Sequence, residues 1–315
     1  MVKINLSTYN IILLNTQNDE NVILDEITYG SLQPDSQPKS IMELLFKFLS
    51  NKKEESPFIR DNKVLYIKDF NVENENKFFG EFLYGTSGSE HSVRNINEDS
   101  EELIITKDQS ILTPYYFYIE IPKNSKQGLL ILESKGTDGI KTLFEGWFGT
   151  FITKQSNTNL KLELKSFLPE KIINTYLDQG VLKKIRFLSS TLPVDTLDIL
   201  DGYEPEEGYV ELKIQINKDN RKPIIDKIKK LINNKSDESK EYGDIIGNGL
   251  ETEDIKLEID LNGSERTFTI NKLENAVPAR DITDELKKGD NGHRTFESIH
   301  NKGKEYADDI FRSSN

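Results

Sequence analysis

The residues of this sequence that could do chemistry most directly are Glu133 and Lys135, which lie two positions apart. They end an apolar run, 128–135, that is typical of a β-strand, so both side chains would point to one face of a sheet. A carboxylate can bind Mg²⁺, and a nearby lysine can offset charge and help to activate water. The pair therefore predicts a catalytic site with Glu133 as metal ligand. The alternative is an ordinary ion pair at a strand edge, and the chain as a whole favours a protein that is not an enzyme.

Composition excludes several other kinds of site. The 315 residues include no cysteine, which rules out disulfides, thiolate metal sites and cysteine nucleophiles. The three histidines, His91, His293 and His300, show no HExxH spacing, which disfavours zinc hydrolysis. There is no G-x-S-x-G sequence to indicate a serine nucleophile. Mg²⁺ is thus the only cofactor that the sequence suggests, and only if the protein is a nuclease.

Charge and hydropathy limit the location and the partners. A net charge of −13 argues against a protein that coats DNA or an anionic membrane. No run approaches the ~18–20 apolar residues that cross a bilayer. The first ten residues lack the basic and apolar regions of a signal peptide. We therefore expect a cytoplasmic protein that does not insert into a membrane.

Helices and strands with clear patterns surround the Glu133 strand. Ser40 and Glu43 have the spacing of a capping box, which predicts a helix over 40–51. An aromatic helix over 138–152 follows the Glu133 strand, with its apolar residues on one face. Its Gly146 and Gly149 predict close approach of a neighbouring backbone. Strands are predicted over 2–15, 64–70, 78–84, 115–121, 128–135 and 160–168.

The strand over 115–121 is unusually aromatic. Tyr115, Tyr116, Phe117 and Tyr118 are consecutive. Such a strand could present a stacking surface to bases or to a peptide. Packing inside the core is the favoured interpretation, because buried aromatic strands are common.

The second half of the chain predicts a smaller set of helices and strands. Alternation over 209–216 and the Asn262-Gly263 turn within 255–270 indicate strands, and 223–233 reads as a helix. A broken apolar stripe from Phe296 onward predicts a final helix. The expected fold is α+β, with a mixed or antiparallel sheet and a packed aromatic helix in residues 1–168, and a smaller α+β domain with a helical end in residues 169–315.

Two basic clusters in this second domain are candidates for nucleic-acid binding. A solvated helix face is the alternative, since charge runs most often lie at the surface. The clusters are Lys183, Lys184 and Arg186, and Lys222, Lys227 and Lys230.

The order of the predicted elements resembles that of the PD-(D/E)xK nucleases. Helix 40–51, three of the strands, helix 138–152 and strand 160–168 follow the αβββαβ order of that family, and Glu133-x-Lys135 matches its last motif. The resemblance implies a Mg²⁺-dependent nuclease. The family's further carboxylate belongs near the start of the preceding strand, where this chain reads Thr113-Pro114-Tyr115.

A second resemblance concerns general character. The segments IPKNSKQGLLILESKG and GIKTLF make the chain similar to bacterial proteins of unknown function from phage-defence islands. This implies a binding or regulatory component of an anti-phage or stress system that acts on a protein or nucleic-acid partner. We also expect a homodimer, formed through an aromatic or C-terminal helical surface. The nuclease and a purely structural interaction module are the alternatives.

Overall fold

The chain divides into two compact units in a computed structural model. Unit 1 comprises Met1–Phe167 and Val277–Asp309, and unit 2 comprises Leu168–Ala276 and Ile310–Asn315. The expected second domain, 169–315, therefore differs from unit 2, because Val277–Asp309 returns to unit 1. The described residues are 2–27, 39–53, 57–95, 103–156, 159–166, 170–189, 210–216, 221–233, 254–261, 264–270 and 279–314.

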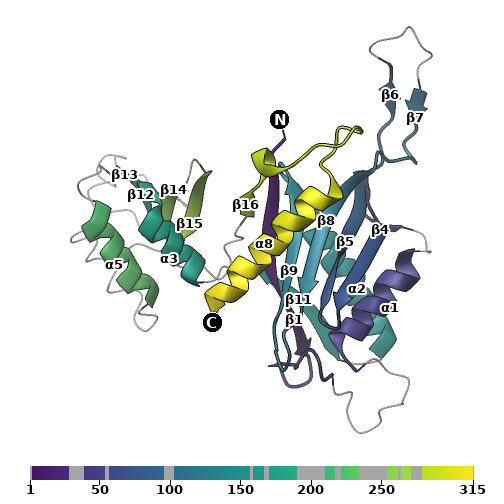
Figure 1. Ribbon diagram of the computed structural model, residues 1–315, viewed down its shortest axis with the longest axis horizontal. Coiled ribbons are helices and arrows are strands. Elements are labelled where there is room, and N and C mark those ends of the chain that lie inside the picture. Colours follow the sequence, from purple (N-terminus) through teal and green to yellow (C-terminus); the bar gives the residue numbers. More distant parts are fainter. Residues whose placement is uncertain are drawn as a thin grey trace, which may run out of the picture. The chain divides into compact units, whose positions relative to one another are not determined.

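A large, curled antiparallel sheet forms the centre of unit 1 (Figure 1). Its strand order is β11 (Leu160–Ser166), β1 (Ile4–Asn15), β9 (Gly128–Lys135), β8 (Thr113–Glu120), β5 (Lys77–Thr86), β4 (Lys63–Asn74), β3 (Phe58–Arg60). The short strands β2 (Glu20–Asn21), β10 (Asp138–Gly139) and β16 (Ala279–Asp281) pair at its margins. Every strand pairing among the described residues is antiparallel, which confirms the α+β fold.

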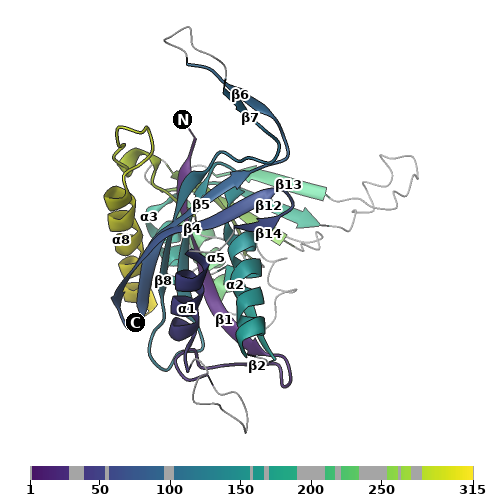
Figure 2. The same ribbon diagram turned by 90° about the vertical axis from the view of Figure 1, so that its right-hand side faces the viewer.

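Two helices, α1 (Ile41–Lys53) and α2 (Lys141–Ser156), cover one face of this sheet (Figure 2). The predicted capping box is confirmed, because the Glu43 amide donates to Ser40 Oγ at 3.2 Å and the Glu43 carboxylate accepts from the Lys39 amide at 2.6 Å. The close backbone approach expected at Gly146 and Gly149 is wrong. A Cβ at either position would meet side chains only, at 3.5 Å or more.

The opposite face is covered by α8 (Phe296–Ser314), which follows β16 and a short 3-10 helix, η3 (Thr283–Glu285) (Figure 2). Its residues Ile299, Tyr306 and Ala307 are buried. Tyr115–Tyr118 lie in the middle of the sheet and are at most 3% exposed, which confirms core packing. The aromatic strand and the apolar stripe of α8 within unit 1 are therefore not the free surfaces that we expected to mediate self-association.

Unit 2 has its own sheet and core. The strand order is β13 (Val210–Gln215), β12 (Val181–Ser189), β14 (Asp254–Leu261), β15 (Ser264–Thr269). Helices α3 (Glu170–Gln179) and α5 (Arg221–Asn233) pack on the face formed by Ile185, Phe187 and Leu257. Pairing of Leu261 with Ser264 confirms the predicted hairpin. None of the helices that the structure describes has both the length and the apolar character of a membrane span.

Candidate functional site

Glu133 and Lys135 lie where β8 and β9 separate. The pairing of these strands ends at Phe117 and Leu132. Beyond that point the two side chains bind backbone groups of β8, since the Tyr116 amide donates to Glu133 Oε2 at 2.7 Å and Lys135 Nζ donates to the Pro114 carbonyl at 2.8 Å. The Glu-x-Lys spacing therefore supplies side-chain hydrogen bonds to backbone groups of β8 that no longer pair with the backbone of β9.

A second buried carboxylate, Glu81, enters from β5, the strand on the other side of β8. Glu81 lies opposite Tyr116 in the sheet and is 5% exposed. On β4, the register shifts between Ile67 and Asp69, so Lys68 lies at an irregularity that re-aims its side chain. Its Nζ donates to Glu81 Oε2 at 2.6 Å.

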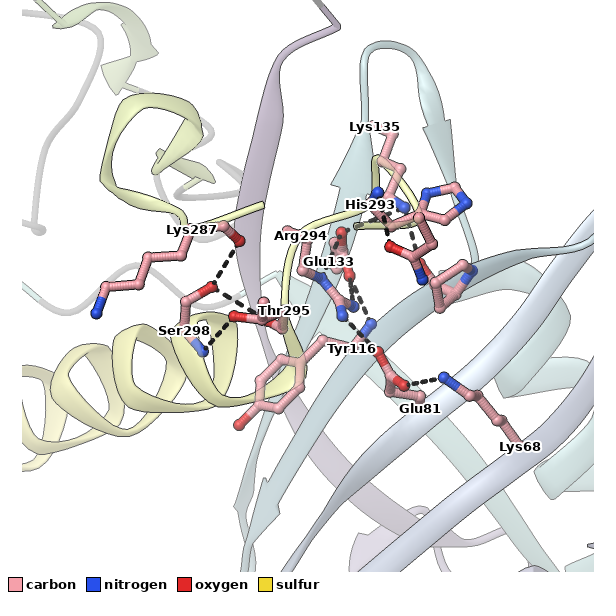
Figure 3. A network of polar contacts seen from close by, with 12 residues as sticks. Lys68, Glu81, Tyr116, Glu133, Lys135, Lys287, His293, Arg294, Thr295 and Ser298 are labelled. Carbon is pink, nitrogen blue, oxygen red and sulfur yellow. Dashed lines mark hydrogen bonds and ion pairs between the residues drawn. The ribbon is translucent and has the colours of Figure 1, made fainter. Parts of the chain in front are cut away.

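Arg294 joins the two carboxylates (Figure 3). It donates through Nε to Glu133 Oε1 at 3.3 Å and through its terminal nitrogens to Glu133 Oε2 and Glu81 Oε1. The side chain of Arg294 is only 2% exposed. We call Glu81, Glu133, Arg294, Lys68 and Lys135 the Arg294 network.

A tight loop and a helix start hold Arg294 in place. Gly292, at φ +76°, closes a turn in which its own amide donates to the Gly289 carbonyl. Next to this turn, Lys288 and Arg294 form an isolated antiparallel β-bridge. Thr295 then caps the start of α8, because its Oγ1 accepts from the Ser298 amide. Turn, arginine and helix cap thus follow one another directly in the sequence.

The electrostatics of the network favour the charged forms of Glu81 and Arg294. Burial alone would raise the pKa of Glu81, but hydrogen bonds from Lys68 and Arg294 lower it below its ordinary value. Burial works against the charge on Arg294 as well, yet the two carboxylates raise the pKa of its guanidinium. Burial lowers the pKa of Lys135, and Glu133 partly offsets that effect.

The network does not fit a Mg²⁺ ion. Both oxygens of Glu133 and both of Glu81 accept hydrogen bonds from cationic side chains or from the Tyr116 amide. Mg²⁺ needs several oxygen ligands in octahedral geometry, whereas here the two carboxylates face a guanidinium and two ammonium groups. No group of three or more His, Asp or Glu side chains within the described ranges is placed to share a metal.

A polar cavity of about 370 Å³ opens beside the network. Lys68, Glu81 and Arg294 line one part of it. The rest is lined by the turn before Arg294, which includes His293, and by Pro114, Thr295 and Phe296. Arg294 and Glu81 contribute little exposed surface, so the cavity offers mainly Lys68, His293 and the turn to solvent.

The side of α8 that faces the sheet adds a titratable contact. His300 Nδ1 lies 3.0 Å from the Tyr116 hydroxyl, and its ring stacks on Phe79 with centroids 4.0 Å apart. Burial, together with the nearby Lys304, lowers the pKa of His300, while Glu73 acts in the opposite direction. This contact couples the helix to the centre of the sheet.

The six basic residues predicted to bind nucleic acid do not form one surface. Lys184 and Arg186 lie on the sheet face opposite α3 and α5, whereas Lys222 and Lys227 are exposed on α5. The cluster on β12 is paired with acidic side chains. Lys183 pairs with Asp260, Lys184 with Glu258, and Arg186 with Glu211 and Glu258. The side chain of Lys230 lies outside the described residues.

An apolar groove runs along α1, away from the network. It measures about 580 Å³ and lies between α1 and the turns that follow β4 and β8. Phe46 is 51% exposed and Val72 46% exposed, although both are large and apolar. The other lining residues include Met42, Phe78, Ile121, Asp25, Glu43, Lys47, Glu75 and Lys123.

Sequence reasoning located Glu133 and Lys135 but missed Glu81, Lys68 and Arg294. One signal was available, because Glu81 interrupts the apolar strand Phe78–Tyr84 and a carboxylate buried there needs a cation. Nothing local identifies Arg294 as that cation, since it lies 213 positions from Glu81. The chain matches no known family model and no curated protein.

Proposed function

We propose that this protein is a binding or regulatory component that holds a protein partner. The observation that carries the proposal is the groove along α1, where Phe46 and Val72 expose apolar side chains beside Met42 and Phe78. Exposed apolar side chains gathered in one groove are typical of interaction sites. Its three carboxylates and two lysines give the rim a mixed charge, which suits a protein more than a polyanion.

The contacts of the candidate catalytic residues, Glu133 and Lys135, support a binding role more than a nuclease. Glu133 and Lys135 bind backbone groups and Arg294, so the pair has a structural use that explains its spacing. Pairing of the β12 basic residues with acids also supports a protein partner over nucleic acid. Nucleic-acid binding, homodimer formation and a role in bacterial defence stay predictions from the sequence.

Partner capture tests the proposal. The tagged protein would be expressed in its source cells as wild type, as Phe46→Asp and as Ile59→Asp, which alters an apolar residue 62% exposed on β3. We expect a protein that co-purifies with wild type and Ile59→Asp but not with Phe46→Asp. Equal recovery from all three variants would contradict the proposal.

The nuclease is tested separately with plasmid, single-stranded DNA and RNA in the presence of Mn²⁺ or EDTA. We expect no metal-dependent cleavage. Cleavage that requires Mn²⁺ and disappears in a folded Lys135→Met variant would favour the nuclease instead.

A further inference from the structure

The sheet of unit 2 ends in an edge strand, β13, whose only neighbour among the described strands is β12 (Figure 2). β13 is six residues long, whereas the strands of the small separate sheet, β6 (His91–Val93) and β7 (Leu103–Ile105), have three each. Proteins commonly keep edge strands short, charged or covered, because an open edge recruits further strands. β13 is thus long enough to accept a further strand.

The apolar face of unit 2 is incompletely covered at β13. Leu212 lies opposite Phe187 in the register and therefore shares its face, on which α3 and α5 pack. Ile214 likewise lies opposite Ile185. The two residues of β12 are buried, but Leu212 and Ile214 are 39% and 38% exposed. At the other edge of the sheet, by contrast, Phe268 of β15 is buried. Only the β13 edge therefore combines an unpaired strand with exposed apolar side chains among the described residues of this sheet.

The sequence of β13 is complementary to itself in an antiparallel pair. Opposite residues share a face of the sheet, so a symmetric pair of β13 strands must be centred on one residue. Centred on Leu212, the pair sets Glu211 of each copy opposite Lys213 of the other. Centred on Lys213 it would oppose two lysines, and centred on Glu211 it would oppose two glutamates. Of these registers, the one about Leu212 matches apolar with apolar and acid with base.

The backbone of β13 agrees with this register. The Ile216 amide donates to the Lys183 carbonyl at 3.0 Å, and hydrogen-bonded pairs alternate along an antiparallel ladder. Leu212 therefore turns its backbone groups toward β12, whereas Glu211 and Lys213 turn theirs to the open edge. Glu211 of one copy can then exchange both hydrogen bonds with Lys213 of the other. Leu212 forms with its equivalent a non-hydrogen-bonded pair, in which side chains approach most closely.

The charges beside Lys213 favour an acidic neighbour. Lys213 lies opposite Arg186 on β12, and like charges directly opposite each other are destabilising. Glu258, on β14 beyond β12, already pairs with Arg186 and Lys184. An acid at the open edge would therefore be a nearer partner for Lys213. Glu211 pairs with Arg186 at 3.4 Å and stays exposed, so its carboxylate can accept a further cation.

We propose that two copies of this chain associate through β13, paired antiparallel about Leu212, so that their unit 2 sheets form one continuous sheet. This surface differs from the aromatic and C-terminal helical surfaces through which the sequence predicted a homodimer. It is also a different surface from the groove along α1, which belongs to unit 1. The net charge of −13 opposes association at long range, but physiological salt screens charges beyond about 8 Å, and the paired strands are in direct contact.

Sedimentation velocity of the full chain at physiological salt measures the dimer. Lys213→Glu makes both charged positions of the strand acidic, and Glu211→Lys makes both basic. We expect a concentration-dependent dimer for wild type and a dissociation constant about tenfold or more higher for each variant alone. An equimolar mixture of the two variants should dimerise again, because an acid then faces a base in both pairs. That recovery would also show that both variants are folded.

Lys222→Glu is the control, since it makes the same change of charge at an exposed position of α5 and should leave dimerisation unchanged. Phe46→Asp should also dimerise normally, so failure here and failure of the groove proposal are distinguishable. A monomeric wild type, or a dimer that Lys213→Glu does not weaken, would refute the β13 interface. A mixture of the two charge variants that stays monomeric would refute the pairing of Glu211 with Lys213.

A cysteine crosslink tests the register. The chain has no native cysteine, so Leu212→Cys introduces a single thiol per copy. Non-hydrogen-bonded opposite residues have Cα atoms about 4.5 Å apart, within the range of a disulfide. Under a mild oxidant we expect a disulfide-linked dimer of Leu212→Cys. Ile214→Cys, of similar exposure, should stay largely unlinked, because its equivalents would lie four residues apart along the strands. Equal crosslinking of the two variants would overturn the Leu212 register.

Discussion

The two faces of the unit 1 sheet are covered by helices that are held in different ways. On one face, α1 and α2 pack through rings, and Phe48 alone contacts Phe144, Trp147, Phe148 and Phe151. On the other, α8 packs through buried apolar residues and is held in addition by Arg294, between two buried carboxylates, and by the His300–Tyr116 contact. Apolar contacts tolerate repacking, whereas separating the partners of a buried ion network leaves buried charge uncompensated. A shift of the returning segment along the sheet would therefore unpair buried charges, whereas α1 and α2 rest mainly on apolar and aromatic contacts.

The largest effect is expected from Arg294→Met. The change leaves Glu81 and Glu133 buried without their shared cation, which should lower the free energy of unfolding by about 3–5 kcal/mol. Denaturant titration measures the loss. Arg280→Met is the control, because its ion pairs with Glu285 and Glu305 lie near the surface and are worth about 1 kcal/mol or less.

A triple variant sharpens this result. Combining Arg294→Met with Glu81→Gln and Glu133→Gln removes the uncompensated charges, so part of the lost stability should return. A triple variant as unstable as the sum of its parts would mean that the network contributes through shape rather than charge.

On the apolar face, Leu45→Ala should cost about 3 kcal/mol, because it leaves a cavity under a fully buried side chain of α1. Phe46→Ala, at the next position but 51% exposed, should change the free energy of unfolding by about 0.5 kcal/mol or less. Similar losses in both variants would show that α1 is not packed as described. Thermal and denaturant unfolding both report the difference.

Two glycines in helices on opposite faces give a matched pair. A Cβ at Gly303 of α8 would lie 2.5 Å from the Tyr116 ring, so Gly303→Ala should cost about 1–2 kcal/mol even after its gain in helix propensity. At Gly146 of α2 the nearest atom would be 3.5 Å away, so Gly146→Ala should be neutral or stabilise by about 1 kcal/mol. A stabilising Gly303→Ala would mean that α8 is not seated on Tyr116.

The smallest effect concerns pH. The folded protein disfavours the protonated His300 ring, so the pKa of His300 is lower in the folded protein than its ordinary value of 6.5. The stability that neutral His300 contributes is therefore complete above pH 6.5 and is lost as the pH falls through the lower pKa of the folded state. Stability measured across this range should fall for wild type and fall less for His300→Gln. His293→Gln, at an exposed position, controls for the removal of a histidine. An identical pH profile for wild type and His300→Gln would contradict the buried contact.

Local patterns predicted much of the fold. The helix expected over 40–51 is α1, and the strand expected over 128–135 is β9 with the same bounds. These elements could be predicted because the spacing of their apolar residues indicates which side is buried. The hairpin of β14 and β15 was predicted for a related reason, since Asn-Gly imposes a tight turn.

The long-range arrangement was not predictable from these patterns. β1 lies between β9 and β11, and β16 pairs with it from the far end of the chain, at Asn5 and Asp281. Hydrophobic periodicity and turn residues do not indicate which strand, distant in the sequence, becomes a neighbour in the sheet. The same limit applies to the candidate site, where Glu133 was identified without the arginine 161 positions away that it binds.

The return of Val277–Asp309 to unit 1 has a consequence for synthesis. Ribosomes deliver the chain at about 5–20 residues per second, and domains generally fold as they emerge. Unit 1 is interrupted by Leu168–Ala276, so most of its sheet is synthesised before β16 and before α8, which covers its second face. During that interval Glu81 and Glu133 have no guanidinium and Tyr116 has no helix above it. The second face of the sheet therefore gains its helix only after the inserted unit has been translated.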